Sequence, residues 1–237
     1  MTKFYIDTFG PHVEDIAKAF KFAISIAKRD KEIKRIIFYS YTKTNFMQVD
    51  KYFEDVHRLQ LPDTGVKIQG MNVLVKCETK ITYRKQYSYG TTDIVIACHM
   101  DSKDIYVLDD DAKAKYIIAI PWIEHGVDEW VRRWFAKEIS GKATVDTKEA
   151  SVDPLLSVAL KEMDILMFET KSLSHQSDEE TCKTYIRTIH KYMPNVTPTE
   201  IENYLVRNLS WTSANANEVG NLLARLKEGR TFKGGAK

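Results

Sequence analysis

The residues of this sequence that could do chemistry stand just after apolar runs. Cys98, His99 and Asp101 follow one such run, and a thiol, an imidazole and a carboxylate are the groups of a nucleophile, a general base and its orienting acid. A plainer role also fits, because a cysteine often ends a buried strand and an aspartate often caps the next helix. His99 and Asp101 are therefore candidate catalytic residues, with capping as the open alternative.

A second polar segment runs from Ser40 to Asn45 and combines hydroxyls with a lysine. Ser40, Thr42 and Lys43 lie between an apolar run and a helical stripe, where a phosphate is readily bound. The segment contains neither GxGxxG nor GxxxxGK[ST], so the dinucleotide and Walker A motifs are absent. The alternative is that its polar residues only cap the next helix and that Lys43 is solvated.

Two further segments supply ligand-binding candidates. Asp7 precedes a turn with Gly10, where the missing side chain lets the backbone approach a ligand closely. Trp122 follows another apolar run and offers a flat face to a base or a sugar. The alternatives are a plain turn for the first segment and packing of Trp122 against Trp130 and Trp134 for the second.

Other polar patterns in the sequence give weaker indications of function. Residues 80–90 interleave basic and aromatic side chains, which suits single-stranded nucleic acid, a lid over the ligand edge or an exposed hairpin. Glu78-Thr79-Lys80 has the ExK spacing of some nucleases, but three residues match by chance very often. The three cysteines are widely spaced and form no CxxC pair, and no HExxH motif or EF-hand loop occurs, so we predict no metal site.

These residues need a scaffold, and the hydrophobic pattern predicts one. Apolar runs predict five strands and amphipathic stripes predict the helices between them, which gives an α/β fold with a Rossmann-like, doubly wound, mostly parallel five-stranded sheet. Because ligands of such sheets bind at the carboxyl ends of the strands, we expect the candidate residues to meet at one edge. The predicted strands are 4–6, 36–39, 73–75, 93–98 and 116–121, and the predicted helices are 12–30, 46–56 and 124–140.

The second part of the chain has only helical patterns. We therefore predict a Rossmann-like domain over residues 1–142 and a helical C-terminal domain over residues 143–237. Within the latter, Thr197 is expected to cap a helix that begins at Pro198, and residues 173–178 are expected to form a linker. Helices at about 198–208 and 213–228 suggest a helix-turn-helix. Gly220 argues against this motif, because a glycine is expected to interrupt the second helix.

Composition narrows the class of protein. The formal net charge is +2, with 24 basic and 22 acidic residues in 1–149 and 11 of each in 150–237, so a nucleic-acid partner is not expected. The three cysteines are few and odd in number, which is typical of a reducing compartment. The absence of a signal-peptide core or a long apolar run predicts a cytoplasmic protein that does not enter the membrane.

The order strand, glycine turn, long helix, strand and Ser/Thr/Lys loop over residues 4–45 resembles two groups of proteins. These are the Rossmann-like domains that sense cyclic oligonucleotides and allosteric α/β domains such as the C-terminal domain of pyruvate kinase. The resemblance is one of pattern at the level of the fold. It implies an architecture and does not fix a function.

The resulting hypothesis is a ligand-binding or sensor protein. The α/β domain would bind a nucleotide-like or other phosphorylated small molecule through Asp7, Ser40, Thr42, Lys43 and Trp122. The helical part would either mediate self-association into a homo-oligomer or transmit the signal of the sensor. The alternatives are a hydrolase or transferase acting on a nucleotide-like substrate, and a nucleic-acid-associated protein with a helical C-terminal module. Whether the protein is an enzyme and which cofactor it uses are left open.

Overall fold

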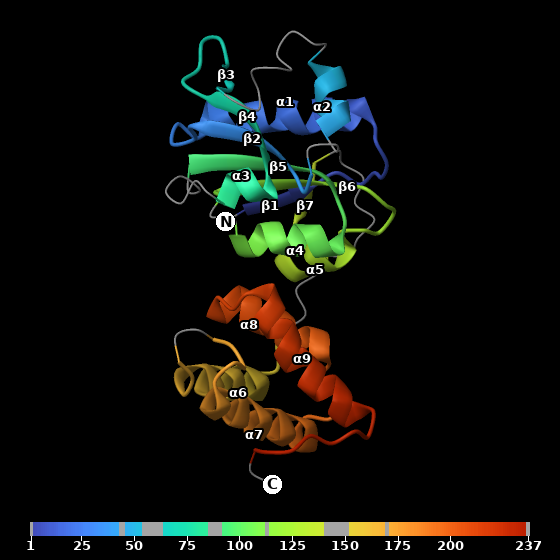
Figure 1. Ribbon diagram of the computed structural model, residues 1–237, viewed down its shortest axis with the longest axis vertical. Coiled ribbons are helices and arrows are strands. Elements are labelled where there is room, and N and C mark those ends of the chain that lie inside the picture. The colour runs from blue at the N-terminus through green and yellow to red at the C-terminus, as the bar shows by residue number, and fades with distance from the viewer. Residues whose placement is uncertain are drawn as a thin grey trace. The chain divides into compact units, whose positions relative to one another are not determined.

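The computed structural model divides into two compact units, residues 1–148 and residues 149–237 (Figure 1). Unit 1 contains the sheet and its helices, and unit 2 is helical in its described residues. The structure describes residues 2–42, 46–53, 64–84, 92–111, 114–139, 152–168 and 171–235.

Unit 1 is a mixed α/β structure around a mostly parallel sheet of seven strands. The strand order is β3-β4-β2-β5-β6-β1-β7, and only β3 is antiparallel to its neighbour. The expectation of five strands was wrong, because the sheet has two additional edge strands of two residues each, β3 and β7. The strands are β1 (Thr2–Tyr5), β2 (Arg35–Ser40), β3 (Val66–Lys67), β4 (Leu74–Thr79), β5 (Asp93–Met100), β6 (Tyr116–Pro121) and β7 (Lys137–Glu138).

The central strands are apolar throughout because both faces of the sheet are covered. Along β2, Ile36 and Phe38 pack on one face, whereas Ile37 and Tyr39 pack on the other. The helices over the first face are α1 (Val13–Arg29) and α2 (Met47–Tyr52). Those over the second are α3 (Lys80–Arg84), α4 (Ser102–Asp111) and α5 (Asp128–Trp134). Figure 1 shows α1 and α2 on the opposite side of the strands from α4 and α5.

The direction of travel across the sheet reverses once. From β1 the chain crosses by α1 to β2 and then reaches β4, and from β4 it returns by α3, α4 and α5 to β5, β6 and β7 in turn. Neighbouring strands β2 and β5 are therefore followed by helices on opposite faces, and so are β6 and β1. In open α/β sheets, such places at the carboxyl edge are where ligands bind.

Helix α5 ends earlier than its apolar stripe predicts. The stripe extends to about residue 140, but the helix stops at Trp134 because Phe135 takes a left-handed backbone conformation with φ of 51°. The amide of Ala136 then donates to the carbonyl of Val131, which closes the helix end. The chain turns back from there and adds β7 beside β1.

The helices of unit 2 are α6 (Pro154–Ile165), α7 (Gln176–Tyr192), α8 (Pro198–Leu209) and α9 (Ser213–Lys227). Thr197 forms the predicted N-cap of α8, and Glu200 completes a capping box. The side chain of Asp164 joins three segments, because it accepts from the Trp211 indole at 2.6 Å and from Lys171 at 3.1 Å.

Two expectations for unit 2 were wrong. Residues 173–178 are not wholly a linker, because α7 already begins at Gln176. Gly220 does not interrupt the last helix, since α9 runs through it. A side chain at Gly220 would collide with Glu202 of α8, so the glycine allows close packing of the two helices.

Candidate functional site

The predicted site residues follow the parallel strands of unit 1. Ser40 ends β2, His99 lies near the end of β5, and Asp7, Thr42, Asp101 and Trp122 stand in the connections after β1, β2, β5 and β6. Because these strands are parallel, all six residues lie at the carboxyl edge of one sheet. Lys43 lies outside the described residues.

The connections after β1, β5 and β6 are tied together around Trp122. Its carbonyl accepts from the amide of Gly10 at 3.0 Å, and its amide donates to the carbonyl of Met100 at 2.9 Å. Its ring stands edge to face with His99 at 5.5 Å between ring centres. Gly10 has φ of 91°, a conformation that suits glycine and that brings the first connection to Trp122.

His99 has an unusual backbone for a strand residue. Its φ is 55°, and the pairing of β5 with β6 shifts register between Ala97 and Met100. Such bulges and left-handed residues cluster beside functional sites because they aim a side chain where a regular strand cannot. The His99 side chain is buried at this edge against Trp122.

Asp7 and its neighbours place carboxylates on the β1 side of the edge. The amide of Asp7 donates to Glu138 of β7 at 3.4 Å. The hydroxyl of Thr8 donates to the buried carboxylate of Asp15 at 2.9 Å, which also pairs with Lys18 at 3.1 Å. The apolar stripe of α1 gave no reason to single out Asp15, so the sequence analysis missed it.

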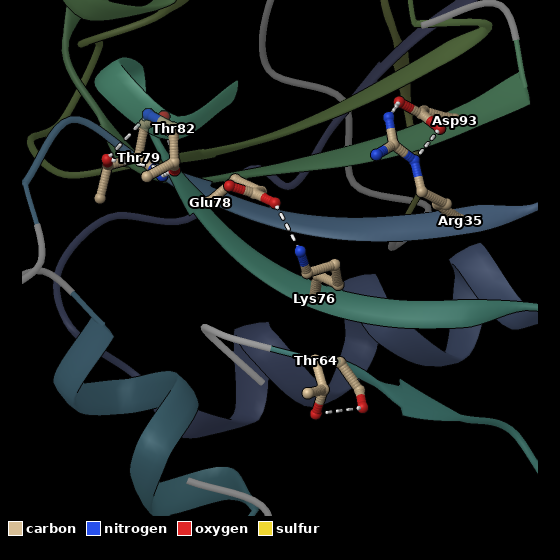
Figure 2. A network of polar contacts seen from close by, with 8 residues as sticks. Arg35, Thr64, Lys76, Glu78, Thr79, Thr82 and Asp93 are labelled. Carbon is tan, nitrogen blue, oxygen red and sulfur yellow. Dashed lines mark hydrogen bonds and ion pairs between the residues drawn. The ribbon is translucent and has the colours of Figure 1, made fainter. Parts of the chain in front are cut away.

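The β2 and β4 side of the edge carries hydroxyls and a lysine. Ser40 is fully buried, and its Oγ has no hydrogen-bond partner among the residues that the structure describes. The amino group of Lys80, just after β4, donates to the Tyr41 hydroxyl at 3.0 Å and lies 4.6 Å from the centre of that ring. Figure 2 shows Thr79 and Thr82 close together, with the Thr82 hydroxyl accepting from the Thr79 amide at 2.8 Å.

The catalytic interpretation of the β5 loop gains little from the geometry. Asp101 Oδ1 accepts the amides of Lys103 and Asp104 at 2.9 and 2.8 Å, which makes Asp101 the cap of α4. Burial raises the pKa of the Cys98 thiol well above its ordinary value, which disfavours a reactive thiolate.

Large apolar side chains are exposed along the same edge. We call this set the apolar rim. In unit 1, every described large apolar side chain that is exposed follows the carboxyl end of β1, β2, β4 or β6, in a loop or at the start of a helix. The apolar rim consists of Phe9, Tyr41, Met47, Ile81, Trp122 and Ile123.

The charges at this edge are unevenly distributed. Helices α1, α2, α4 and α5 all begin there, and each has a carboxylate in its first turn. These carboxylates oppose an anion at those helix starts. The first turn of α3 has no acidic residue and begins with Lys80. Burial and the Asp101 charge raise the pKa of Asp104. Lys80 lies close enough to work against that rise.

A buried ionic network lies on the sheet below the β2 and β4 side (Figure 2). Arg35 donates twice to Asp93, at 2.8 and 2.5 Å, and Lys76 pairs with Glu78 at 3.2 Å. Burial raises the pKa of Asp93, and Arg35 works against that rise. Burial and the Asp93 charge also raise the pKa of the nearby Tyr83 hydroxyl. These groups satisfy one another, so we assign them a structural role.

A cavity of about 660 Å³ opens at the opposite, amino edge of the sheet. One of its lysines, Lys115, pairs with Asp30 at 2.7 Å and with Glu32 at 2.6 Å, and Tyr116 donates to Asp30 at 2.9 Å. These ion pairs hold the pKa of Asp30 below its usual value and raise that of Lys115. None of the exposed large apolar side chains of the described unit 1 lines this cavity, and both of its acidic residues are paired with Lys115, so the carboxyl edge is the better candidate.

Two kinds of feature are absent from the residues that the structure describes. Within these ranges, no group of three or more histidine, cysteine or acidic side chains is placed to hold a metal ion. No helix in the described part of the chain has the length and apolar character needed to cross a membrane.

Comparison with known proteins adds one finding. A family described as a domain of unknown function (DUF1889) matches residues 152–237, which is nearly all of unit 2. No curated protein and no solved structure matches the chain. The family match therefore concerns the helical part and does not include the candidate site in unit 1.

Proposed function

We propose that unit 1 is a Rossmann-like, doubly wound ligand-binding module that takes a nucleotide-like small molecule at the carboxyl edge of its sheet. The observation that carries the proposal is the apolar rim, which gathers the exposed large apolar side chains of the described unit 1 at one edge. Rims of this kind mark binding surfaces, because exposed apolar side chains are otherwise scattered. The two places where neighbouring strands are followed by helices on opposite faces, β2/β5 and β6/β1, support the same edge.

The charges and the spacing favour a nucleoside monophosphate held in one orientation. The phosphate would lie beside Lys80 and the Ser40 hydroxyl, since the other described helix starts repel anions. The base would stack on Trp122, and Asp7, which follows β1 beyond the strand of Trp122, would accept from a donor group of the base. Ser40 and Trp122 are two strand spacings apart and Lys80 after β4 lies one spacing further out, so the phosphate and base ends of the site are about 10–15 Å apart.

Isothermal titration with adenosine, its 5′-monophosphate and its 5′-triphosphate tests this proposal, followed by the corresponding guanine, cytosine and uracil compounds. We expect the monophosphate of at least one base to bind more tightly than its nucleoside or its triphosphate. Trp122→Ala should weaken binding of that monophosphate about tenfold, because stacking contributes about 1–3 kcal/mol per base. Tyr192→Ala, which removes an exposed aromatic ring from unit 2, is the matched control.

Lys80→Ala distinguishes the contribution of the phosphate to the binding affinity from that of the rest of the ligand. The variant should bind the monophosphate about tenfold less tightly, as expected for a lost charge-assisted hydrogen bond, and should bind the nucleoside as before. A triphosphate that binds more tightly than the monophosphate would contradict the charge argument. A monophosphate affinity that is unchanged in Trp122→Ala would remove the apolar rim from the site.

The enzymatic alternative has one observation in its favour, the left-handed backbone of His99. Asp101 is engaged in capping α4, so we favour binding without turnover. Recovery of the bound compound unchanged after long incubation, measured by mass spectrometry, is the expected result. A converted product that disappears in His99→Gln would favour a hydrolase or transferase instead.

We also propose that the protein resides in the cytoplasm. The support is that all three cysteines are free and buried, which fits a reducing compartment. We expect a denatured sample prepared without reductant to titrate as three thiols per chain. A lower count, together with an intact mass short of two hydrogens, would show a disulfide and contradict the assignment.

A further inference from the structure

The two ends of the candidate site carry opposite charges. On the β2 and β4 side, Lys80 donates to the Tyr41 hydroxyl at 3.0 Å, and the first turn of its helix has no acidic residue. On the β1 side, the carboxylates of Asp7, Asp15 and Glu138 lie in or against the connection that follows β1. A ligand that spans the site therefore meets a cation at one end and hydrogen-bond acceptors at the other.

Two of the three carboxylates on the β1 side are already engaged. Glu138 accepts from the amide of Asp7 at 3.4 Å, and Asp15 accepts from the Thr8 hydroxyl at 2.9 Å and pairs with Lys18 at 3.1 Å. The Asp7 side chain is partly exposed, and no residue within the described ranges donates a hydrogen bond to it. An ionised carboxylate only accepts, with about four lone-pair positions on its two oxygens. Asp7 is therefore open to a ligand that brings donors.

Asp7 belongs to the same turn as the aromatic part of the apolar rim. It follows β1, whereas Trp122 follows the neighbouring strand β6, and the amide of Gly10 joins the two connections by donating to the Trp122 carbonyl at 3.0 Å. Phe9 precedes Gly10 and is 52% exposed, and Trp122 is 48% exposed. A base that stacks at these rings turns an edge to the connection in which Asp7 is the open acceptor.

Guanine is the base whose edge matches a carboxylate. Its N1–H and its 2-amino group are adjacent donors, so one carboxylate accepts both, as it accepts the paired donors of a guanidinium. Adenine and cytosine set a ring nitrogen with a lone pair beside the amino group, and uracil sets a carbonyl on each side of N3–H, so each turns an acceptor toward the oxygen anion. Building on the proposed function, we propose that the site selects guanosine 5′-monophosphate and that Asp7 determines this choice.

Isothermal titration with the 5′-monophosphates of guanosine, inosine, adenosine, cytidine and uridine tests the inference. We expect the guanosine compound to bind about tenfold or more tightly than each of the others, inosine monophosphate included because it lacks only the 2-amino group and so loses one charge-assisted hydrogen bond. Another base that binds as tightly as guanine overturns the inference and leaves the proposed function in place. A protein that binds none of the five compounds overturns both.

Asp7→Asn provides a second arm, in which the preference should change. The asparagine amide keeps one acceptor and adds a donor, so it matches xanthosine 5′-monophosphate, in which a carbonyl replaces the 2-amino group. The variant should bind guanosine monophosphate about tenfold or more weakly than the wild-type protein, and should bind xanthosine monophosphate more tightly than the wild-type protein does. A variant that had merely lost structure would gain affinity for neither compound.

Asp153→Asn is the matched control. It makes the same change at an exposed residue of unit 2, where asparagine caps α6 as well as aspartate does, so both affinities should stay as in the wild-type protein. If Asp7→Asn keeps the wild-type preference for guanosine monophosphate, Asp7 does not read the base and the inference is wrong. The proposed function then still stands, provided that Lys80→Ala weakens binding of the monophosphate.

Discussion

Arg35 and Asp93 face each other across the neighbouring strands β2 and β5. The Asp93 carboxylate is fully buried and accepts both Arg35 hydrogen bonds, and Tyr83 adds a weaker one at 3.5 Å. Arg35→Met should therefore lower the free energy of unfolding by about 3–5 kcal/mol, because it leaves a buried charge unpaired. Urea unfolding at pH 7 measures this loss.

The double variant Arg35→Met/Asp93→Leu distinguishes a charge effect from lost packing. It removes both charges, so it should recover most of the stability that the single variant loses. A double variant as unstable as Arg35→Met would show that the contribution of Arg35 lies in its shape.

Lys3 makes unit 1 sensitive to pH. Its amino group contacts Asp109 and lies 3.6 Å from the centre of the Trp134 ring, and burial lowers its pKa to about 6 despite the attraction of Asp110. The unfolded chain has the ordinary lysine pKa of about 10.4, so between pH 6 and 10 it binds the proton that the folded protein lacks. Stability from this residue therefore rises with pH across that window and is lost as the pH falls towards 6.

Lys3→Met isolates this contribution. We expect the free energy of unfolding of the wild-type protein, measured relative to that of Lys3→Met, to rise by up to about 1.4 kcal/mol per pH unit between pH 7 and 9. Urea titrations at several pH values give this difference. Parallel pH profiles for the two proteins would mean that Lys3 stays charged in the folded state.

At the scale of single elements, α8 depends on its first residues. Thr197 Oγ1 accepts from the Glu200 amide at 3.2 Å, and Glu200 accepts from the Thr197 amide at 2.7 Å. Thr197→Ala removes the cap and should cost about 1 kcal/mol of unit 2 stability, whereas Thr197→Ser should cost little. Thermal unfolding followed at 222 nm measures both, and equal loss in the two variants would contradict the capping role.

The long buried elements could be predicted from the sequence, whereas the short edge strands could not. Runs such as Ile36–Tyr39 have no polar interruption, and burial on both faces requires this. Strand β7, Lys137–Glu138, has no apolar residue and is held by backbone pairing with β1, so no hydrophobic pattern marks it. The end of α5 was missed for a related reason, since the left-handed turn at Phe135 is not visible in residue types.

The candidate site was predictable as a set of strand ends but not as a set of contacts. Polar residues after apolar runs predict which side chains share an edge. The tie between Gly10 and Trp122 and the pairing of Lys80 with Tyr41 depend on which strands are neighbours, and no local pattern encodes strand order. The acidic residues at the helix starts disfavour an anionic ligand at this edge because those helix starts lie together, and the sequence alone does not show that they do.

At the scale of the whole molecule, unit 2 has a core of its own. Its buried residues include Leu160, Ile186, Leu205 and Leu223 from four different helices, and the family match covers the same part of the chain. We therefore expect residues 152–237 to fold without unit 1, with helical circular dichroism and one cooperative transition. The expected free energy of unfolding is about 4–13 kcal/mol for a chain of this length.

Fluorescence of Trp211 in that fragment is the most direct test. The buried ring and its bond to Asp164 predict a blue-shifted emission that moves to longer wavelength on unfolding. A fragment with solvent-like emission and a gradual urea response would show that unit 2 needs the rest of the chain.

The position of β1 in the sheet has a consequence for how the protein is made. Its residue Phe4 lies opposite Ile118 on one side and Lys137 on the other, so both neighbours of this strand are synthesised long after it. Until then, β1 has no sheet to join, although β2, β4 and β5 can already pair with one another. Of the strands of this sheet, the first to be synthesised is thus among the last to be incorporated, and the nascent chain carries β1 unpaired until β6 has been made.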